Sequence, residues 1–360
     1  MAEKLKNVYT KDYIQTLSNK IKNNFQNFDD KGFKLNIFNN NWQNLELKDR
    51  MRHIALCLNT FLPFCYKEQL DILKEVSKSF TGFEAMFFQD FVEVFGLDDF
   101  ENSMKALEIF TIDSSSEFAI RQFILKYEDE TMAQLKFWAK SENEHIRRLA
   151  SEGCRPRLPW AIALPKFKNN PTKVFQILEL LKNDPSKYVQ KSVANNLNDI
   201  SKDNPELVLN FVKNNLGKSK NLDWICKHAS RTLLKKGDKE CLELFGFLSS
   251  DHIQLVDFNI DNTIVLGEDL NFSFTLQSQE NLGNIRVEYE IEYMKAKGKT
   301  SKKIFMVFQG EVKQKNKSFF KKQSFKNMTT RKHYEGIHNI SIVINGTNKK
   351  SKSFLLKRLK

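Results

Sequence analysis

The sequence lacks a long apolar segment. No uninterrupted apolar run reaches the roughly 18 residues that a membrane-spanning helix needs, so no part of the chain is expected to cross a membrane. The first residues mix charged and apolar side chains and lack the basic-then-apolar order of a secretory signal. Because 41% of the residues are hydrophobic, we expect a well-packed cytoplasmic protein.

Clustered metal ligands are also missing. The five cysteines are odd in number, widely spaced and without a C-x-x-C pair, and the six histidines form no H-E-x-x-H pattern. Zinc sites and disulfide frameworks need ligands that are close together or evenly paired. We therefore predict reduced cysteines, no bound metal and no cofactor.

Positive charge is abundant and unevenly distributed. The formal net charge is +13, and residues 291–360 alone carry +16. Such a block attracts polyanions such as nucleic acids. A solvated lysine-rich surface explains the same numbers, so charge alone leaves both readings open.

The 360 residues are enough for two domains. Over residues 1–249, apolar side chains recur every three or four positions, as at Phe87, Phe91 and Val94, which predicts helices. From 252–360 the period changes to two, as at Leu270, Phe272 and Phe274, which predicts strands. About seven strands are expected, at residues 252–260, 270–277, 284–294, 303–312, 317–326, 337–344 and 351–356. They fit an immunoglobulin-like β-sandwich without an internal disulfide.

Three similar tetrapeptides indicate internal repeats in the helical part. His145-Ile-Arg-Arg, Tyr188-Val-Gln-Lys and Trp224-Ile-Cys-Lys each open a predicted helix, and their starts lie 43 and 36 residues apart. That period is typical of paired-helix repeats of the HEAT kind, which stack into a superhelical α-α solenoid with a concave binding face. The sequence thus predicts a mainly α protein with a small all-β domain at its end.

When the repeats are aligned, a basic side chain occupies the same position in each of them. Arg148, Lys191 and Lys227 share it, with Arg121 as a possible fourth member, and this basic row suits a phosphate backbone. Arg231 points the same way one turn after Lys227. Solvation of the helix surfaces is the alternative role for all of these side chains.

Carboxylates interrupt the basic row. Glu152 lies four residues after Arg148, and Asp199 lies three before Lys202, so helix geometry alone favours ordinary ion pairs for both. Trp160 lies in Arg155-Pro-Arg-Leu-Pro-Trp, where Pro156 and Pro159 are expected to end one helix and start the next. With Arg155 and Arg157 beside it, Trp160 could contact DNA or belong to the core.

These motifs resemble those of the DNA alkylation repair glycosylases of the AlkC type. The resemblance rests on residues 147–160, 188–199 and 224–234, with an upstream motif at 115–121. The last 110 residues are similar to the immunoglobulin-like domain of some members, with matches at residues 330–336 and 343–346. Gln122 departs from the pattern, in which proline is expected.

The resemblance implies a glycosylase that removes cationic bases such as 3-methyladenine and 3-methylcytosine from double-stranded DNA. It assigns the catalytic carboxylates to Glu117, Glu152 and Asp199 and a substrate contact to Trp160. On this reading Arg121, Arg148, Arg155, Arg157, Lys191, Lys227 and Arg231 bind DNA, and residues 252–360 form an accessory DNA-binding domain. We expect a monomer. A non-catalytic nucleic-acid-binding scaffold and a protein-interaction scaffold are the alternatives.

Overall fold

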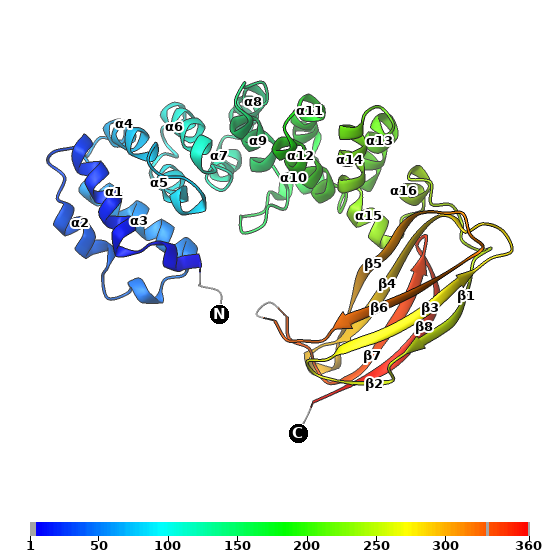
Figure 1. Cartoon of the computed structure of the whole chain (residues 1–360). Coiled ribbons are helices and arrows are strands. Elements are labelled where there is room, and N and C mark those ends of the chain that lie inside the picture. Colours follow the sequence, from blue (N-terminus) through cyan, green and yellow to red (C-terminus); the bar gives the residue numbers. More distant parts are fainter. Residues whose placement is uncertain (1–4, 329–330, 359–360) are drawn as a thin grey trace. The chain divides into compact units, whose positions relative to one another are not determined.

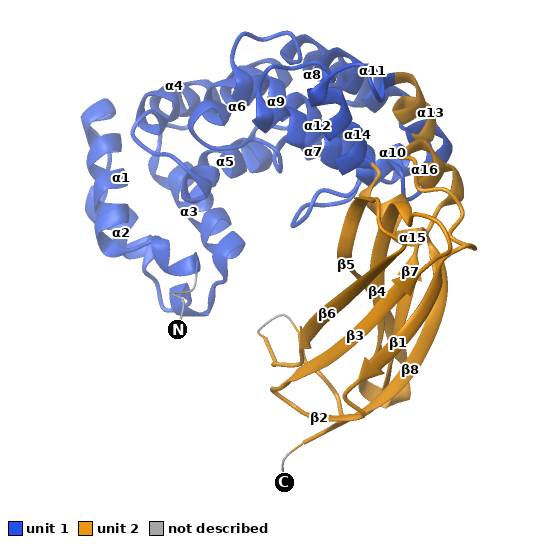
Figure 2. Ribbon diagram, turned by 45° about the vertical axis from the view of Figure 1, so that its right-hand side comes forward, with its two compact units in different colours: residues 1–208, 215–229 blue, residues 209–214, 230–360 orange. Residues whose placement is uncertain are grey.

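The computed structural model describes residues 5–328 and 331–358. Thr330, the first residue of the late-strand motif, lies outside them. The chain divides into two compact units, one of residues 1–208 and 215–229 and the other of residues 209–214 and 230–360 (Figure 2). The second unit therefore contains short helices in addition to the strands, and the predicted division at residues 249 and 252 stays a prediction.

The first unit is built of α-helices that follow one another in a curved row (Figure 1). Short 3-10 turns connect some of them. The predicted helical solenoid is confirmed. The α-helices in chain order are α1 (Lys11–Asn24), α2 (Asp30–Ile37), α3 (Leu47–Phe61), α4 (Tyr66–Ser77), α5 (Phe87–Phe95), α6 (Phe100–Asp113), α7 (Ile120–Lys126), α8 (Glu128–Trp138), α9 (Glu144–Gly153), α10 (Pro165–Asn169), α11 (Thr172–Leu181), α12 (Lys187–Ile200), α13 (Pro205–Asn215) and α14 (Lys220–Ala229).

The repeated motifs lie on α9, α12 and α14, where α12 packs against both of the others. Local sequence explains where two of them begin. The side chain of Asn143 accepts a hydrogen bond from the His145 backbone N–H (2.8 Å), and Ser186 does the same for Tyr188 (3.2 Å). These caps satisfy backbone donors that have no partner within the helix.

Two predicted helix starts are wrong. Trp224 lies within α14, which begins at Lys220, and a separate helix α15 (Arg231–Lys236) follows Ser230. The next helix after α9 begins at Pro165 rather than Pro159. Proline is tolerated at a first helical position because its missing N–H has no partner there in any case. The intervening residues form a loop.

The second unit contains residues 209–214 of α13, the helices α15 and α16 (Lys239–Leu244), and a β-sandwich. One sheet has the order β1-β3-β6 and the other β2-β8-β7-β4-β5. The predicted immunoglobulin-like sandwich is confirmed, with the short β2 as an additional strand. The strands are β1 (Gln254–Ile260), β2 (Thr263–Val265), β3 (Asp269–Gln277), β4 (Gly283–Met294), β5 (Thr300–Val312), β6 (Asn316–Ser324), β7 (Gly336–Ile344) and β8 (Thr347–Lys357).

Alternating side chains fill the space between the two sheets. Phe272 and Phe274 of β3 are 1% exposed, and Val287 and Ile291 of β4 are fully buried. The five cysteines are free, and none lies beyond Cys241. Apolar packing therefore holds the sandwich together without a disulfide. Among the described residues, no helix combines the length and the apolar character that crossing a membrane requires.

A buried histidine should make the sandwich sensitive to acid. His333 is 3% exposed beside Phe325, and burial, followed by the nearby Arg331 charge, lowers its pKa from 6.5 to about 4. Above pH 6.5 the ring is neutral whether or not the chain is folded. Between pH 6.5 and about 4 only the unfolded chain takes up this proton, so stability falls as the pH falls. We expect His333→Gln to lose that part of the pH dependence in thermal unfolding curves; identical pH profiles for both proteins would contradict this.

Candidate active site

Three carboxylates from separate segments converge in the helical unit. Glu117 lies in the turn before α7, Glu152 in the last turn of α9 and Asp199 near the end of α12. Because α9 and α12 pack side by side, one arginine can reach both of their carboxylates. The three residues lie together in the structure, as predicted. Their catalytic roles stay predictions.

Arginines connect the three carboxylates into one network. Arg148 Nη1 donates to Glu117 Oε2, and Arg148 Nη2 lies 3.4 Å from Glu152 Oε1. Arg155 Nη1 donates to Glu152 Oε1 (2.6 Å), and its Nε donates to Asp199 Oδ2 (2.9 Å). We call this set, with Lys202, the carboxylate network. Lys202 completes it through a 3.0 Å contact to Asp199 Oδ1.

The network becomes more buried from Glu117 toward Asp199. The side chains of Glu117, Glu152 and Asp199 are 15%, 6% and 3% exposed. Among the described residues, no donor reaches the second oxygen of Glu117, Oε1. Burial opposes the charged form of Arg148 and of Arg155, but the adjacent carboxylates outweigh it and raise the pKa of both arginines.

The charges of the carboxylate network balance one another. Three carboxylates alternate with the three cations Arg148, Arg155 and Lys202, so the patch is not the net anionic surface that isolated carboxylates would form. The ion pairs Arg148–Glu152 and Lys202–Asp199 that helix spacing favours are both present. These ion pairs include the catalytic candidates themselves. Glu152 and Asp199 can therefore form ion pairs and still be candidates for catalysis.

Serines that sequence reasoning missed also support the network. Ser192 Oγ donates to Glu152 Oε2 (2.7 Å), and Ser115 Oγ donates to Glu117 Oε2 (2.9 Å). Ser151 Oγ in turn donates to Ser192 Oγ (2.7 Å). Ser192 directly follows Lys191 of the basic row, but nothing in its local pattern marks it as a partner of a carboxylate.

The prediction that Arg121 contacts DNA is wrong for this structure. Its side chain is fully buried and donates to the backbone carbonyls of Gly153, Arg155 and Ile162 (2.9, 2.8 and 2.7 Å). Burial lowers the pKa of Arg121 to about 10. A guanidinium is long enough to turn inward wherever carbonyl oxygens satisfy its donors. Arg121 therefore supports both ends of the loop that follows α9.

The remaining predicted DNA contacts differ in accessibility. Lys191 and Lys227 are exposed. Arg148 and Arg155 are held in the carboxylate network, and Arg157 forms a two-point ion pair with Asp203 (2.6 and 3.0 Å) at the surface. Arg231 is partly buried and belongs to the second compact unit. A continuous basic row of free side chains is thus not present.

Trp160 lies on the loop between α9 and α10, which projects from the helices (Figure 1). Its side chain is 70% exposed, which removes the core alternative. Its backbone has a φ of 63°, a left-handed conformation that is costly for a bulky residue. Lys48 Nζ donates to the Trp160 carbonyl (2.8 Å) from α3, a contact across 112 positions for which the sequence gives no signal.

Comparison with known proteins agrees with this architecture. A family model described as "DNA alkylation repair enzyme" matches residues 101–237, and one described as "Uncharacterised protein YhaZ, C-terminal Ig-like domain" matches residues 254–358. The uncharacterized protein YhaZ of Bacillus subtilis (strain 168) is 45% identical over 352 residues, which cover 97% of this chain and 98% of that protein.

A solved structure is similar over the whole chain. It is the Pseudomonas fluorescens alkylpurine DNA glycosylase AlkC bound to DNA containing an abasic site analog, with 35% identity and a TM-score of 0.94, covering 99% of this chain and 100% of that one. Helical repeats followed by an immunoglobulin-like sandwich thus define an AlkC-like class of protein. The chain belongs to the DNA alkylation repair enzyme family.

Proposed function

We propose that the protein is a DNA glycosylase that hydrolyses the N-glycosidic bond of cationic N-alkylated bases, such as 3-methyladenine and 3-methylcytosine, in double-stranded DNA. The observation that carries the proposal is the convergence of Glu117, Glu152 and Asp199 in one network. The 35% identity to an alkylpurine DNA glycosylase over nearly the whole chain supports it.

The chemistry suits carboxylates. A base alkylated at N3 carries a positive charge and leaves as a neutral molecule, so it needs no general acid. The sugar becomes oxocarbenium-like, and a carboxylate can stabilise that cation and align the attacking water. Its effect grows when bound DNA excludes solvent, because the local dielectric constant falls. Asp199 is our candidate for aligning the water.

The arginines give the network a second role when DNA binds. We propose that Arg148 gives up its ion pair with Glu117 and binds a DNA phosphate instead, because the Arg148–Glu117 pair lies at the more exposed end of the network. That exchange leaves the Glu117 carboxylate to face the lesion while the phosphate keeps the arginine charge paired. Arg155 is enclosed by Glu152 and Asp199 and stays in place as a positioning residue.

The test is the identity of the product. Purified protein is incubated with methylated double-stranded DNA, and the released small molecules are separated and identified by mass spectrometry. The proposal expects free 3-methyladenine or 3-methylcytosine and abasic sites in equal amounts. DNA binding without any released base would instead support the non-catalytic scaffold.

Loss of the Trp160 ring should weaken DNA binding with little effect on folding. Stacking of one aromatic side chain contributes about 1–3 kcal/mol, so Trp160→Ala is expected to weaken binding of abasic or methylated duplexes about 5- to 150-fold. Trp160→Gly should bind DNA as weakly as Trp160→Ala. It should be slightly more stable than Trp160→Ala, because glycine adopts a φ of 63° without strain. Fluorescence anisotropy and thermal unfolding measure the two effects. Unchanged affinity in both variants would remove Trp160 from the site.

We propose an accessory DNA-binding role for the sandwich, supported by its many lysines between 295 and 322. Lys313 and Lys315 are exposed after β5. Each phosphate contact contributes about 0.9 to the slope of log affinity against log salt concentration. We expect Lys313→Gln with Lys315→Gln to weaken binding and to flatten this slope by one to two such contacts. A slope equal to that of the wild type would exclude this pair from the interface.

A further inference from the structure

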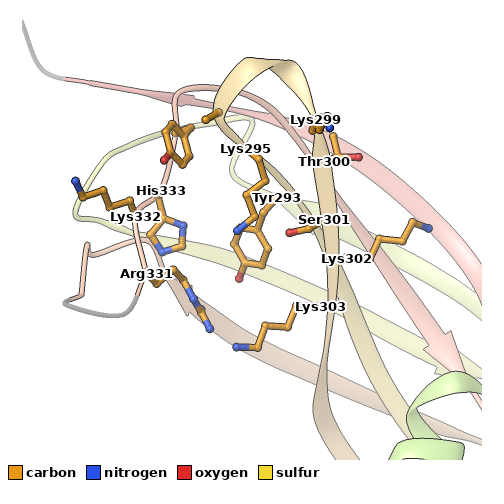
Figure 3. Close-up of a pocket in the computed structure, with 12 residues that line it drawn as sticks. Tyr293, Lys295, Lys299, Thr300, Ser301, Lys302, Lys303, Arg331, Lys332 and His333 are labelled. Carbon is orange, nitrogen blue, oxygen red and sulfur yellow. The ribbon is translucent and has the colours of Figure 1, made fainter. Parts of the chain in front are cut away.

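The β-sandwich contains a basic cavity. Its residues belong to the second compact unit, whereas the carboxylate network belongs to the first. Its volume is about 810 Å³, and β4, β5, the turn between them and the segment before β7 form its walls (Figure 3). Among the described residues, its lining includes six residues with cationic side chains and no aspartate or glutamate. They are Lys295, Lys299, Lys302, Lys303, Arg331 and Lys332.

The cations at this cavity are poorly neutralised. Within residues 5–328 and 331–358, an ion pair reaches one of the six, Lys302, whose Nζ lies 2.9 Å from Glu290. Burial, followed by the charges of Arg331 and other cations, lowers the pKa of Lys303. Like charges held together in this way repel one another, and a bound anion would relieve the repulsion.

A buried hydroxyl group is the second, independent observation. Tyr293 is 5% exposed, and its hydroxyl is buried without a hydrogen-bond partner among the described residues. Figure 3 shows this hydroxyl on the same side as the ends of Arg331 and Lys303, whereas Lys302 points away. A buried donor without an acceptor costs free energy, and an anion bound in the cavity would supply the acceptor.

Together these features fit a small, strongly charged acceptor. A phosphate oxyanion offers several oxygens, which can accept from a hydroxyl, a guanidinium and an ammonium at once. The Arg331 guanidinium also lies over the Tyr293 ring, 5.8 Å from its centroid, so these two residues already lie side by side. We propose that this cavity binds one phosphate group of a nucleic-acid strand through Tyr293, Lys303 and Arg331.

This inference uses the proposed DNA-binding role of the sandwich only for the source of the phosphate. The source is either a phosphomonoester at a strand end or a phosphodiester within the strand. Failure of the glycosylase proposal leaves it intact, because binding of inorganic phosphate involves neither the lesion nor the carboxylate network.

The first arm of the test uses the full chain and inorganic phosphate, with binding followed by calorimetry. Tyr293→Phe removes one oxygen that has no partner in the folded protein, so folding should be unaffected. We expect this variant and Arg331→Gln each to weaken phosphate binding at least about tenfold, as for a hydrogen bond to a charged group. Lys350→Gln, an exposed charge change on β8, should stay within twofold. No phosphate binding by the wild type, or equal losses in all three variants, would overturn the site.

The second arm distinguishes the two sources of phosphate. Matched oligonucleotides with a 5′-phosphate or a 5′-hydroxyl are bound to the wild type and to Tyr293→Phe. A loss confined to the phosphorylated strand identifies a terminal phosphate, and equal losses for both strands identify an internal one. If Tyr293→Phe binds both strands as tightly as the wild type does, the cavity takes no part in nucleic-acid binding and the proposal fails.

Discussion

Replacing Asp199 by asparagine is expected to lower the rate of base release about 100- to 1000-fold. Removing one preorganised electrostatic group from an active site has effects of this size. Asparagine keeps the shape and one acceptor oxygen for Arg155, but it cannot stabilise a developing sugar cation or activate a water molecule. Affinity for DNA with an abasic site should change little, because Asp199 is 3% exposed and its oxygens are held by Arg155 and Lys202.

Asp203→Asn is the matched control. Asp203 lies four residues later, pairs with Arg157 and is 27% exposed, so this substitution makes the same chemical change outside the carboxylate network. Single-turnover release of methylated bases, with binding measured on the same DNA, separates chemistry from affinity. Equal rates for Asp199→Asn and the wild type would remove Asp199 from the catalytic residues.

Arg155→Leu is expected to destabilise the helical unit by about 3–5 kcal/mol. Arg155 is 8% exposed at its side chain and connects Glu152 with Asp199, so its loss leaves two buried carboxylates without their shared cation. Removing one partner from a buried ion pair has a cost of this order. Denaturant unfolding followed by the helical circular dichroism signal measures the loss.

Two comparisons make this prediction specific. Arg157→Leu removes the same side chain two positions later from an exposed pair and should cost at most about 1 kcal/mol. Adding Glu152→Gln and Asp199→Asn to Arg155→Leu should recover part of the lost stability, because the two buried carboxylate charges that shared Arg155 are then gone. If Arg155→Leu costs no more than Arg157→Leu, Arg155 does not hold the carboxylates in place.

Much of the architecture could be predicted from periodicity. Apolar side chains at helical spacing and the change to period two near residue 252 identify a helical solenoid and a sandwich, since burial of one face determines both patterns. The short β2 was missed because three residues carry no usable alternation. Trp224 was misplaced because a tetrapeptide motif shows where a repeat recurs rather than where its helix begins.

The candidate site was less predictable. Motif resemblance identified Glu117, Glu152 and Asp199, whereas spacing identified only their neighbours on the same helix. A helical wheel shows which side chains share a face of one helix. It does not show whether another segment of the chain covers and buries the polar face. This is why Arg121 was expected outside and lies inside, and why the sharing of Arg155 between α9 and α12 became visible only in three dimensions.

The most direct measurement compares base release by the wild type with release by Glu117→Gln/Glu152→Gln/Asp199→Asn. Both proteins are saturated with the same double-stranded DNA containing 3-methyladenine, and binding is confirmed before the reaction is followed. We predict release by the wild type well above the spontaneous rate and release by the triple variant at the spontaneous rate. Equal release by the two proteins, or none above the spontaneous rate by the wild type, would contradict catalysis by the carboxylate network.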